Sequence, residues 1–202
     1  MIVAGVTGGI GSGKSTLCKV WESLGAKVIY ADNLAKKLMV EDEAVIRQLK
    51  QVFGEKTYHK DGSLNKEYLI QEAFQKERVE ELNRIVHPAV TRKFREIIEE
   101  TAQTDTKILV KEAALLLNSG RPEDLDVVVI VLAPEKDQIE RVKERDSVSD
   151  VDVIGRMNKQ PDFESLKSIA DYTIENSGTL KEFKQKSEEL FYRVLEDYRD
   201  AV

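Results

Sequence analysis

A lysine and two hydroxyl side chains end a short run of very small residues near the start of the chain, TGGIGSGKST at residues 7–16. Gly8, four further residues, and then Gly13, Lys14 and Ser15 give the spacing G-x-x-x-x-G-K-[ST] of a phosphate-binding loop. Glycine allows the positive φ angles with which backbone N–H groups turn inward and surround an anion. The lysine of such a loop reaches the β- and γ-phosphates, and the serine hydroxyl binds Mg²⁺. The run therefore predicts a site for a nucleoside triphosphate.

The residues on either side of the loop fit this prediction. Residues 2–6 (IVAGV) are typical of a short buried strand, and residues 15–24 of a helix that Gly25 ends. The alternative, an ordinary glycine and serine turn, does not explain this order of strand, loop and helix. We expect the loop to bind ATP with Mg²⁺, Lys14 to act also in catalysis and Ser15 to hold the metal; the binding residues are Gly8, Gly9, Ile10, Gly11, Ser12, Gly13, Lys14, Ser15 and Thr16.

A carboxylate, Asp32, follows a second expected strand at residues 26–30 (AKVIY). In open α/β sheets, ligands bind at the carboxyl ends of the strands. A carboxylate at that edge can orient an acceptor hydroxyl or accept its proton. The spacing supports equally well a helix N-cap, a position at which aspartate is common.

Two arginines, Arg141 and Arg145, lie four residues apart on an expected helix at residues 134–145. Like charges at this spacing repel each other, so their pairing indicates an anionic partner such as a triphosphate. The alternative is a solvated helix face on which Asp137 pairs with Arg141. Arg156 and Gln160 follow on the next expected helix, and the segment 141–162, which Pro161 interrupts, is predicted to be a lid over the nucleotide.

Three further polar positions are weaker candidates. His87 precedes Pro88 and is a candidate for binding the acceptor, since histidine binds phosphate, although a structural histidine is the more common case. Asn176 and Gly178 follow the last expected strand, where a loop contacts a nucleotide base in some kinases or forms an ordinary turn.

The elements that must position these side chains alternate between strands and helices, which predicts a mostly parallel sheet covered on both faces. Further strands are expected from residue 107, at 126–133 and at 171–176. Residues 33–105 are charged and mostly helical, with a helix that Pro88 ends. A last helix is expected to follow Thr179 and to bury Leu180, Phe183, Leu190, Phe191, Val194 and Tyr198. Residues 33–105 leave the sheet beside the phosphate loop, where an inserted segment can hold a second substrate.

The composition argues against nucleic-acid binding and against a membrane span. The 202 residues carry a net charge of -6, which is unlike a general nucleic-acid surface. A single cysteine, Cys18, forms no internal disulfide, so we expect a reducing, cytoplasmic setting. No apolar run approaches the roughly 20 residues of a membrane span, and no feature of the sequence indicates an obligate protein partner.

Seven segments in this order resemble the dephospho-CoA kinase family over nearly the whole chain. The first segment is the phosphate loop itself. The next three are VIYAD ending at Asp32, His87-Pro88, and ALLLNSG at 114–120. The other three are RVKERD at 141–146, GRMNKQ at 155–160 and ADYTIENSG at 170–178. The chain departs from the family pattern at Tyr30 and Asn118, where the family carries acidic residues, and at Ala114, where it carries proline.

The resemblance implies an α/β, three-layer P-loop NTPase fold with a mostly parallel five-stranded sheet, a helical insertion that binds the acceptor, and a lid. It implies a core of residues 1–32 and 106–202, with the insertion at 33–105. The implied reaction transfers the γ-phosphoryl group of ATP to the ribose 3′-hydroxyl of dephospho-CoA. It implies catalytic roles for Asp32, also at the acceptor, and for Arg141, with Arg145 near the nucleotide. The alternatives are a nucleoside or nucleotide kinase and a nucleotide-dependent regulatory switch.

Overall fold

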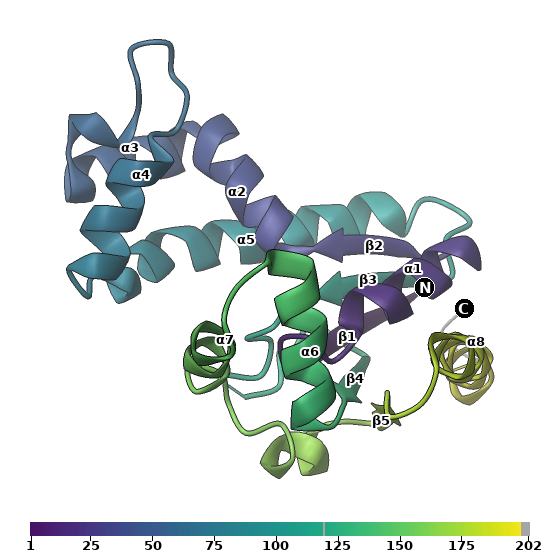
Figure 1. The fold of residues 1–202 in the computed structure, drawn as a ribbon. Coiled ribbons are helices and arrows are strands. Elements are labelled where there is room, and N and C mark those ends of the chain that lie inside the picture. Colours follow the sequence, from purple (N-terminus) through teal and green to yellow (C-terminus); the bar gives the residue numbers. More distant parts are fainter. Residues whose placement is uncertain (119, 199–202) are drawn as a thin grey trace. The chain divides into compact units, whose positions relative to one another are not determined.

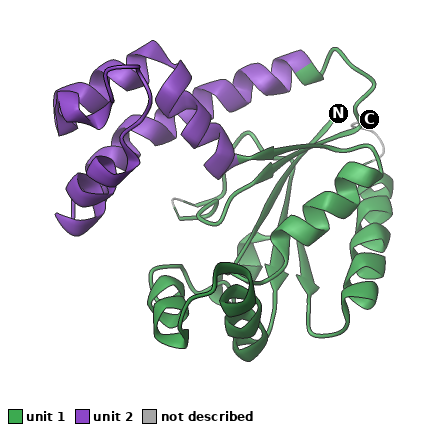
Figure 2. Ribbon diagram, turned by 45° about the horizontal axis from the view of Figure 1, so that its top comes forward, with its two compact units in different colours: residues 1–30, 101–202 green, residues 31–100 purple. Residues whose placement is uncertain are grey.

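The computed structural model describes residues 1–118 and 120–198, and these divide into two compact units (Figure 2). Unit 1 comprises residues 1–30 and 101–202, and unit 2 comprises residues 31–100. Unit 2 is therefore inserted into unit 1, and both of its boundaries lie a few residues earlier than the range 33–105 expected from the sequence. Ser119, within the ALLLNSG segment, and residues 199–202 lie outside the described residues.

Unit 1 contains a five-stranded sheet in the order β2-β3-β1-β4-β5, and every pairing in it is parallel. The sheet confirms the fold class predicted from the sequence. Every residue of β1 and β4 is buried, as expected for central strands covered on both faces. The strands are β1 Ile2–Gly8, β2 Lys27–Tyr30, β3 Ile108–Glu112, β4 Val127–Leu132 and β5 Tyr172–Glu175.

Helices cover both faces of this sheet. The connection from β1 to β2 and the one from β4 to β5 run in opposite directions across it, so right-handed crossovers place their helices on opposite faces. Trp21 lies at the centre of one face, with its ring edge against Phe191 and its indole nitrogen donating to the Ser187 carbonyl oxygen. The helices of unit 1 are α1 Lys14–Ser23, α6 Glu135–Asp146, α7 Asp150–Met157 and α8 Leu180–Asp197, with a 3-10 turn at Ser165–Ile169 (Figure 1).

Capping residues begin the last two helices where the sequence predicted. Ser149 with Asp152, and Thr179 with Glu182, each form a reciprocal capping box. The predicted burial of Leu180 is wrong, because its side chain is 61% exposed. Leu180 is the first residue of α8, one turn before the face that packs on the sheet, whereas Phe183 is buried.

Unit 2 is helical and has its own hydrophobic core, which extends from Leu38 to Val90. Asp42 caps α3 through the N–H groups of Ala44 and Val45 and accepts a hydrogen bond from Arg92 of α5 at 2.6 Å. The elements of unit 2 are α2 Ala31–Glu41, α3 Glu43–Phe53, α4 Lys66–Leu69, a 3-10 turn Glu55–Thr57, a π-helical turn Ile70–Gln75, and α5 Val79–Thr101, which runs across the boundary into unit 1.

The expected helix break at Pro88 is wrong, because α5 continues through it without interruption. A proline inside a helix removes one backbone hydrogen bond and costs roughly 3 kcal/mol. Buried side chains on both sides of Pro88 offset that cost, since Ile85, Val86, Ala89 and Val90 all belong to the core of unit 2. No helix in residues 1–118 and 120–198 combines the length and apolar character needed to cross a bilayer.

Candidate active site

The predicted phosphate loop connects β1 to α1, and its glycines sit where a side chain would not fit. Gly8 has φ 147, and a Cβ there would lie 2.2 Å from the Val131 carbonyl oxygen. Gly13 has φ 112, and a Cβ there would lie 2.4 Å from Nδ2 of Asn176. Both angles lie in the range that glycine alone adopts readily. The sequence therefore forms a tight turn whose N–H groups lead into the N-terminus of α1, where an anion is stabilised.

Lys14 folds back over the start of the loop. Its Nζ donates to the carbonyl oxygens of Gly8 at 2.9 Å and Gly9 at 3.1 Å. These bonds hold the ammonium at the end of the loop that follows β1. Ser15 and Thr16 occupy the first turn of α1 on the other side, and the Ser15 side chain is exposed.

Glu112 is a charged residue of this site that the sequence analysis did not identify. It is the last residue of β3, and its Oε1 lies 4.0 Å from Lys14 Nζ. The two side chains are only 12% and 11% exposed. Its signal in the sequence was a carboxylate at the end of a largely apolar strand. Its nearness to Lys14 depends on the pairing of β3 with β1, which the spacing of residues does not reveal.

Arg141 and Asn176 reach the loop from α6 and from the end of β5. Arg141 donates to the Gly11 carbonyl oxygen at 3.3 Å, and Asn176 donates from Nδ2 to the Ser12 carbonyl oxygen at 2.8 Å. Arg141 also forms the ion pair with Asp137, at 3.6 Å, that the solvated-face alternative required. The sequence-predicted Arg141 therefore does lie against the phosphate loop.

Ser12 is fully buried, and its hydroxyl oxygen has no hydrogen-bond partner among the described residues. A buried polar atom without a partner costs about 1–3 kcal/mol, and this one lies within the phosphate loop itself. An anion-binding loop with an unsatisfied hydroxyl, a lysine and an arginine beside it fits a polyphosphate.

Gln160 contacts the loop from the turn after α7. Its Oε1 accepts the N–H of Ile10 at 2.8 Å. The neighbouring Gly9 lies against α6, because a Cβ there would fall 2.5 Å from Oε1 of Gln138. Gln160 was expected in the lid segment, but its position in the sequence did not indicate this contact.

Arg145 is placed differently from Arg141, since it does not contact the loop but pairs with its neighbour Asp146 at 2.7 and 3.1 Å. Arg156 of α7 donates to the same carboxylate at 2.7 Å. Hydrogen bonding to Arg145, followed by that to Arg156, lowers the pKa of Asp146 to about 2. Both lid arginines therefore share one carboxylate on the exposed side of the lid segment.

Asp32 belongs to unit 2, where it lies in the first turn of α2, two residues after the end of β2. Its side chain is exposed. Helix α2 begins at Ala31, so Asp32 is a residue of the first turn and not the N-cap. Tyr30, in the place of a family acid, donates to Glu22 at 3.3 Å, and burial raises the pKa of its phenol above the usual range.

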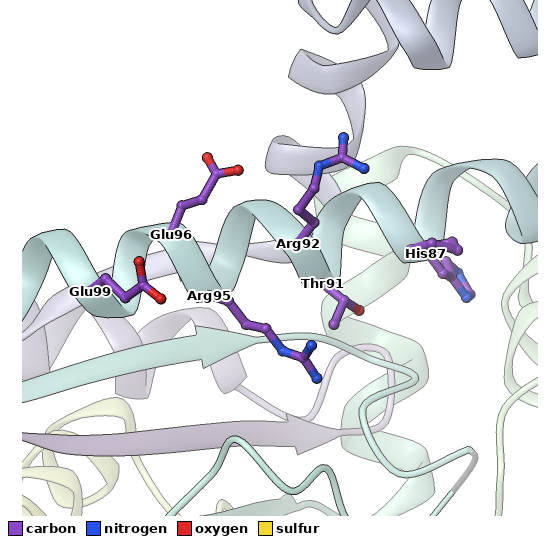
Figure 3. Close-up of a pocket in the computed structure, with 7 residues that line it drawn as sticks. His87, Thr91, Arg92, Arg95, Glu96 and Glu99 are labelled. Atoms are coloured by element: carbon purple, nitrogen blue, oxygen red, sulfur yellow. The ribbon is translucent and has the colours of Figure 1, made fainter.

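His87 lines a hollow along α5 of unit 2, with a volume of about 640 Å³. Figure 3 shows that His87, Thr91 and Arg95 point to one side of the helix, whereas Arg92 and Glu96 point to the other. These three are spaced four residues apart and so form one stripe. Arg92 pairs with Asp42, while Arg95 makes no ion pair with any residue in 1–118 or 120–198.

The described residues contain no group of three or more histidine, cysteine, aspartate or glutamate side chains arranged to hold a metal ion. Mg²⁺ in nucleotide sites uses one or two protein ligands together with phosphate oxygens and water. Ser15 follows Lys14 in α1, and Glu112 lies 4.0 Å from the Lys14 ammonium. A hydroxyl and a carboxylate are oxygen groups of the kind that Mg²⁺ binds.

The chain matches the family model described as dephospho-CoA kinase over residues 2–182. A dephospho-CoA kinase of Salinibacter ruber is 46% identical over 195 residues, covering 96% of this chain and 98% of the relative. One from Chlorobium chlorochromatii is 35% identical, with coverage of 96% and 94%.

Solved structures give a similar picture. Protein TT1252 of Thermus thermophilus superposes with a TM-score of 0.76 at 30% identity, covering 95% of this chain and 97% of that one. A dephospho-CoA kinase from Campylobacter jejuni gives a TM-score of 0.65 at 26% identity, with coverage of 95% and 96%. A shikimate kinase of Acinetobacter baumannii, at 15% identity and a TM-score of 0.55, shares the fold.

Proposed function

We propose which residues perform each part of the reaction of this chain, which belongs to the dephospho-CoA kinase family. Members of this family catalyse the ATP-dependent phosphorylation of dephospho-CoA in coenzyme A synthesis, and so does this chain. The γ-phosphoryl group of ATP moves to the ribose 3′-hydroxyl of the acceptor, giving coenzyme A and ADP. Catalysis of phosphoryl transfer is mostly positioning and charge stabilisation. The role of each residue therefore depends on where its charge or its hydrogen-bonding group lies.

The loop from Gly8 to Thr16 is proposed to hold the triphosphate, and the observation that carries this proposal is the position of Lys14. Its ammonium is fixed at 2.9 and 3.1 Å from two loop carbonyl oxygens, so it does not need to be ordered when the phosphates arrive. Preorganised charge of this kind is worth more than a flexible side chain, because no reorganisation accompanies the reaction. The unsatisfied Ser12 hydroxyl supports the same assignment.

Mg²⁺ is proposed to be held by the Ser15 hydroxyl, with the Glu112 carboxylate acting directly or through its water ligands. When bound, the ion supplies charge that neutralises the β- and γ-phosphate oxygens. The ammonium of Lys14 lies 4.0 Å from the carboxylate of Glu112 and compensates its negative charge at the end of β3.

Arg141 is proposed to stabilise the negative charge that develops on the transferred group. It is half-buried, contacts the Gly11 carbonyl oxygen, and stands on α6, the helix that leads into the lid segment. Arg145 is proposed to bind the nucleotide after exchanging Asp146 for phosphate. Closure of the part of the segment 141–162 that does not already contact the loop would exclude water and so limit hydrolysis of ATP.

Asp32 is proposed to orient the acceptor hydroxyl and to accept its proton. The exposed carboxylate follows β2 at the carboxyl edge of the sheet, where ligands of such sheets bind. In a loose transition state the proton leaves late, so aiming the oxygen is the larger part of this role. Tyr30 does not substitute for Asp32, because its raised pKa keeps the phenol protonated at neutral pH.

Unit 2 is proposed to bind dephospho-CoA, and the hollow along α5 is its candidate contact. The acceptor carries a diphosphate, and His87, Thr91 and Arg95 present hydrogen-bond donors and positive charge on one side of the helix. Arginine recognises phosphate through its planar guanidinium.

We also propose a cytoplasmic location and action without a nucleic-acid partner or an obligate protein partner. The single cysteine, Cys18, supports the first, since one cysteine forms no internal disulfide and few disulfides are expected in a reducing compartment. The net charge of -6 supports the absence of a nucleic-acid partner.

An acceptor screen tests the reaction. ATP consumption is measured with dephospho-CoA, with adenosine and with AMP, and the product is identified by mass spectrometry. Phosphorylation of dephospho-CoA alone is expected. Comparable turnover of adenosine or AMP would instead identify a nucleoside or nucleotide kinase.

A further inference from the structure

Gln160 reaches the phosphate loop from 150 residues further along the chain. It lies in the turn that closes α7, where its own N–H donates to the Met157 carbonyl oxygen at 2.9 Å. The turn is fixed on both sides by buried apolar side chains, Val153 before it and Phe163 after it. Its Oε1 is thereby held 2.8 Å from the N–H of Ile10.

The N–H of Ile10 and the C=O of Gly9 belong to the same peptide unit. Such a unit is planar and trans, so its N–H and C=O point in opposite directions. On the carbonyl side, Gly9 accepts hydrogen bonds from Lys14 Nζ at 3.1 Å and from the Ser12 N–H at 3.1 Å. Gln160 on one side and Lys14 on the other therefore fix the orientation of one peptide plane.

We propose that Gln160 is a positioning residue for Lys14, acting through the Gly9–Ile10 peptide. Rotation of this peptide would turn the Gly9 oxygen away from the ammonium and break the hydrogen bond of 3.1 Å between them. The inference rests on the proposed role of Lys14 in binding the triphosphate.

Within the loop, the Ser12 N–H and Lys14 Nζ restrain this peptide on its carbonyl side, whereas Gln160 restrains it on its N–H side. Arg141 holds the loop at the Gly11 carbonyl oxygen and Asn176 holds it at the Ser12 carbonyl oxygen, both further along the chain. Gly9 and Gly11, on either side of Ile10, have no side chains to resist rotation. The amide of Gln160 is thus the side-chain contact that orients the Gly9–Ile10 peptide from the lid segment.

A double-mutant cycle between Gln160 and Lys14 tests this coupling. Gln160→Met keeps the length of the side chain and removes the acceptor oxygen. The loss of one hydrogen bond predicts ATP affinity that is weaker by about 2- to 12-fold. In a Lys14→Ala background the same substitution is expected to change ATP affinity by less than about 1.5-fold, because the residue it positions is gone. Affinity is measured by titration calorimetry on the full chain.

Steady-state kinetics provide a second readout, a selective change in KM for ATP, which a merely structural role of Gln160 would not produce. Gln160→Met is expected to raise KM for ATP while leaving KM for dephospho-CoA unchanged. Asn158→Ala, an exposed amide in the same turn, is the matched control and should change neither. Gln160→Ala is the second variant if the methionine variant does not melt cooperatively.

The outcomes separate the inference from the function it rests on. Equal weakening of ATP binding by Gln160→Met in both backgrounds overturns the coupling but leaves the role of Lys14 intact. Unchanged ATP affinity in Gln160→Met likewise overturns it. Unchanged affinity in Lys14→Ala overturns the proposed role of Lys14, and the inference with it.

Discussion

Two hydrogen bonds join Arg141 to Asn176, from Nη2 of the arginine to the backbone oxygen of the asparagine at 3.2 Å and to its side-chain oxygen at 3.4 Å. Asn176 in turn donates to the Ser12 carbonyl oxygen. A residue of α6 and the residue that follows β5 thus hold the phosphate loop together. The guanidinium is fixed next to the loop by partners other than a phosphate, which makes it a preorganised charge.

Replacement of Arg141 by alanine is expected to reduce activity far more than stability. Loss of one preorganised donor to a developing charge costs about 10²–10³ in kcat. Arg193→Ala, an exposed arginine on α8, is the matched control. Turnover and melting temperature are measured side by side, and a large fall in melting temperature with a proportionate loss of turnover would indicate a purely structural arginine.

Lys14→Ala is expected to weaken ATP binding and to reduce turnover strongly while the protein remains folded. The lost ammonium would otherwise compensate charge on the β- and γ-phosphates. Calorimetric titration with ATP and circular dichroism check the two parts, with Lys19→Ala, an exposed lysine of α1, as control. Near-normal ATP affinity in the folded variant would remove Lys14 from the nucleotide site.

Asp32→Asn is expected to slow phosphoryl transfer by about 10²–10⁴-fold, the usual contribution of a positioned general base. The amide keeps the size of the side chain and loses its charge and basicity, so ATP binding should be unchanged. The measurement is single-turnover transfer at saturating ATP and dephospho-CoA. Glu41→Gln, an exposed acid on the same helix, is the control. A wild-type rate in Asp32→Asn would exclude it from the mechanism.

Arg95→Ala is expected to raise KM for dephospho-CoA by about 10- to 150-fold, since a hydrogen bond to a charged group contributes about 1.5–3 kcal/mol. KM for ATP should not change. Arg84→Ala is the matched control, because this arginine lies on the same helix and is 76% exposed. If both variants raise KM for dephospho-CoA equally, the effect is one of general charge, and the hollow along α5 does not bind the acceptor.

Asp146→Asn is expected to lower the melting temperature slightly at pH 7, with an effect that disappears in acid. The folded pKa of about 2 lies below the unfolded value of about 3.9, so the carboxylate stabilises the fold above pH 4. This stabilisation is lost as the pH falls from 4 toward 2. Melting curves from pH 7 to pH 2 are compared with those of Glu140→Gln. A constant difference across this range would contradict the assignment of the low pKa to Asp146.

The phosphate loop and the two capping boxes were predictable because each depends on residues close in the sequence. Gly8 to Ser15 fix a turn by their own backbone preferences, and Ser149 and Thr179 begin helices through bonds that span three residues. The parallel sheet followed from the alternation of apolar strands with helices.

Long-range contacts could not be predicted in the same way. Pro88 has the local signature of a helix end, and only the buried residues around it explain why α5 continues. Glu112 becomes a neighbour of Lys14 because β3 pairs with β1, and Gln160 meets Ile10 across 150 residues. In each case the deciding interaction joins elements whose pairing no spacing specifies.

The insertion of unit 2 also determines the order in which the chain can fold during synthesis. Strand β1 pairs with β3, beginning at Ile108, and with β4, beginning at Val127. Strand β1 therefore has no partner in the sheet until more than 100 residues have been made. Unit 2, continuous from residue 31 to 100, has its own core and emerges from the ribosome complete before either strand. Domains generally fold as units during synthesis. We therefore expect the helical unit to fold first, and the sheet that carries the phosphate loop to form only after unit 2 is complete.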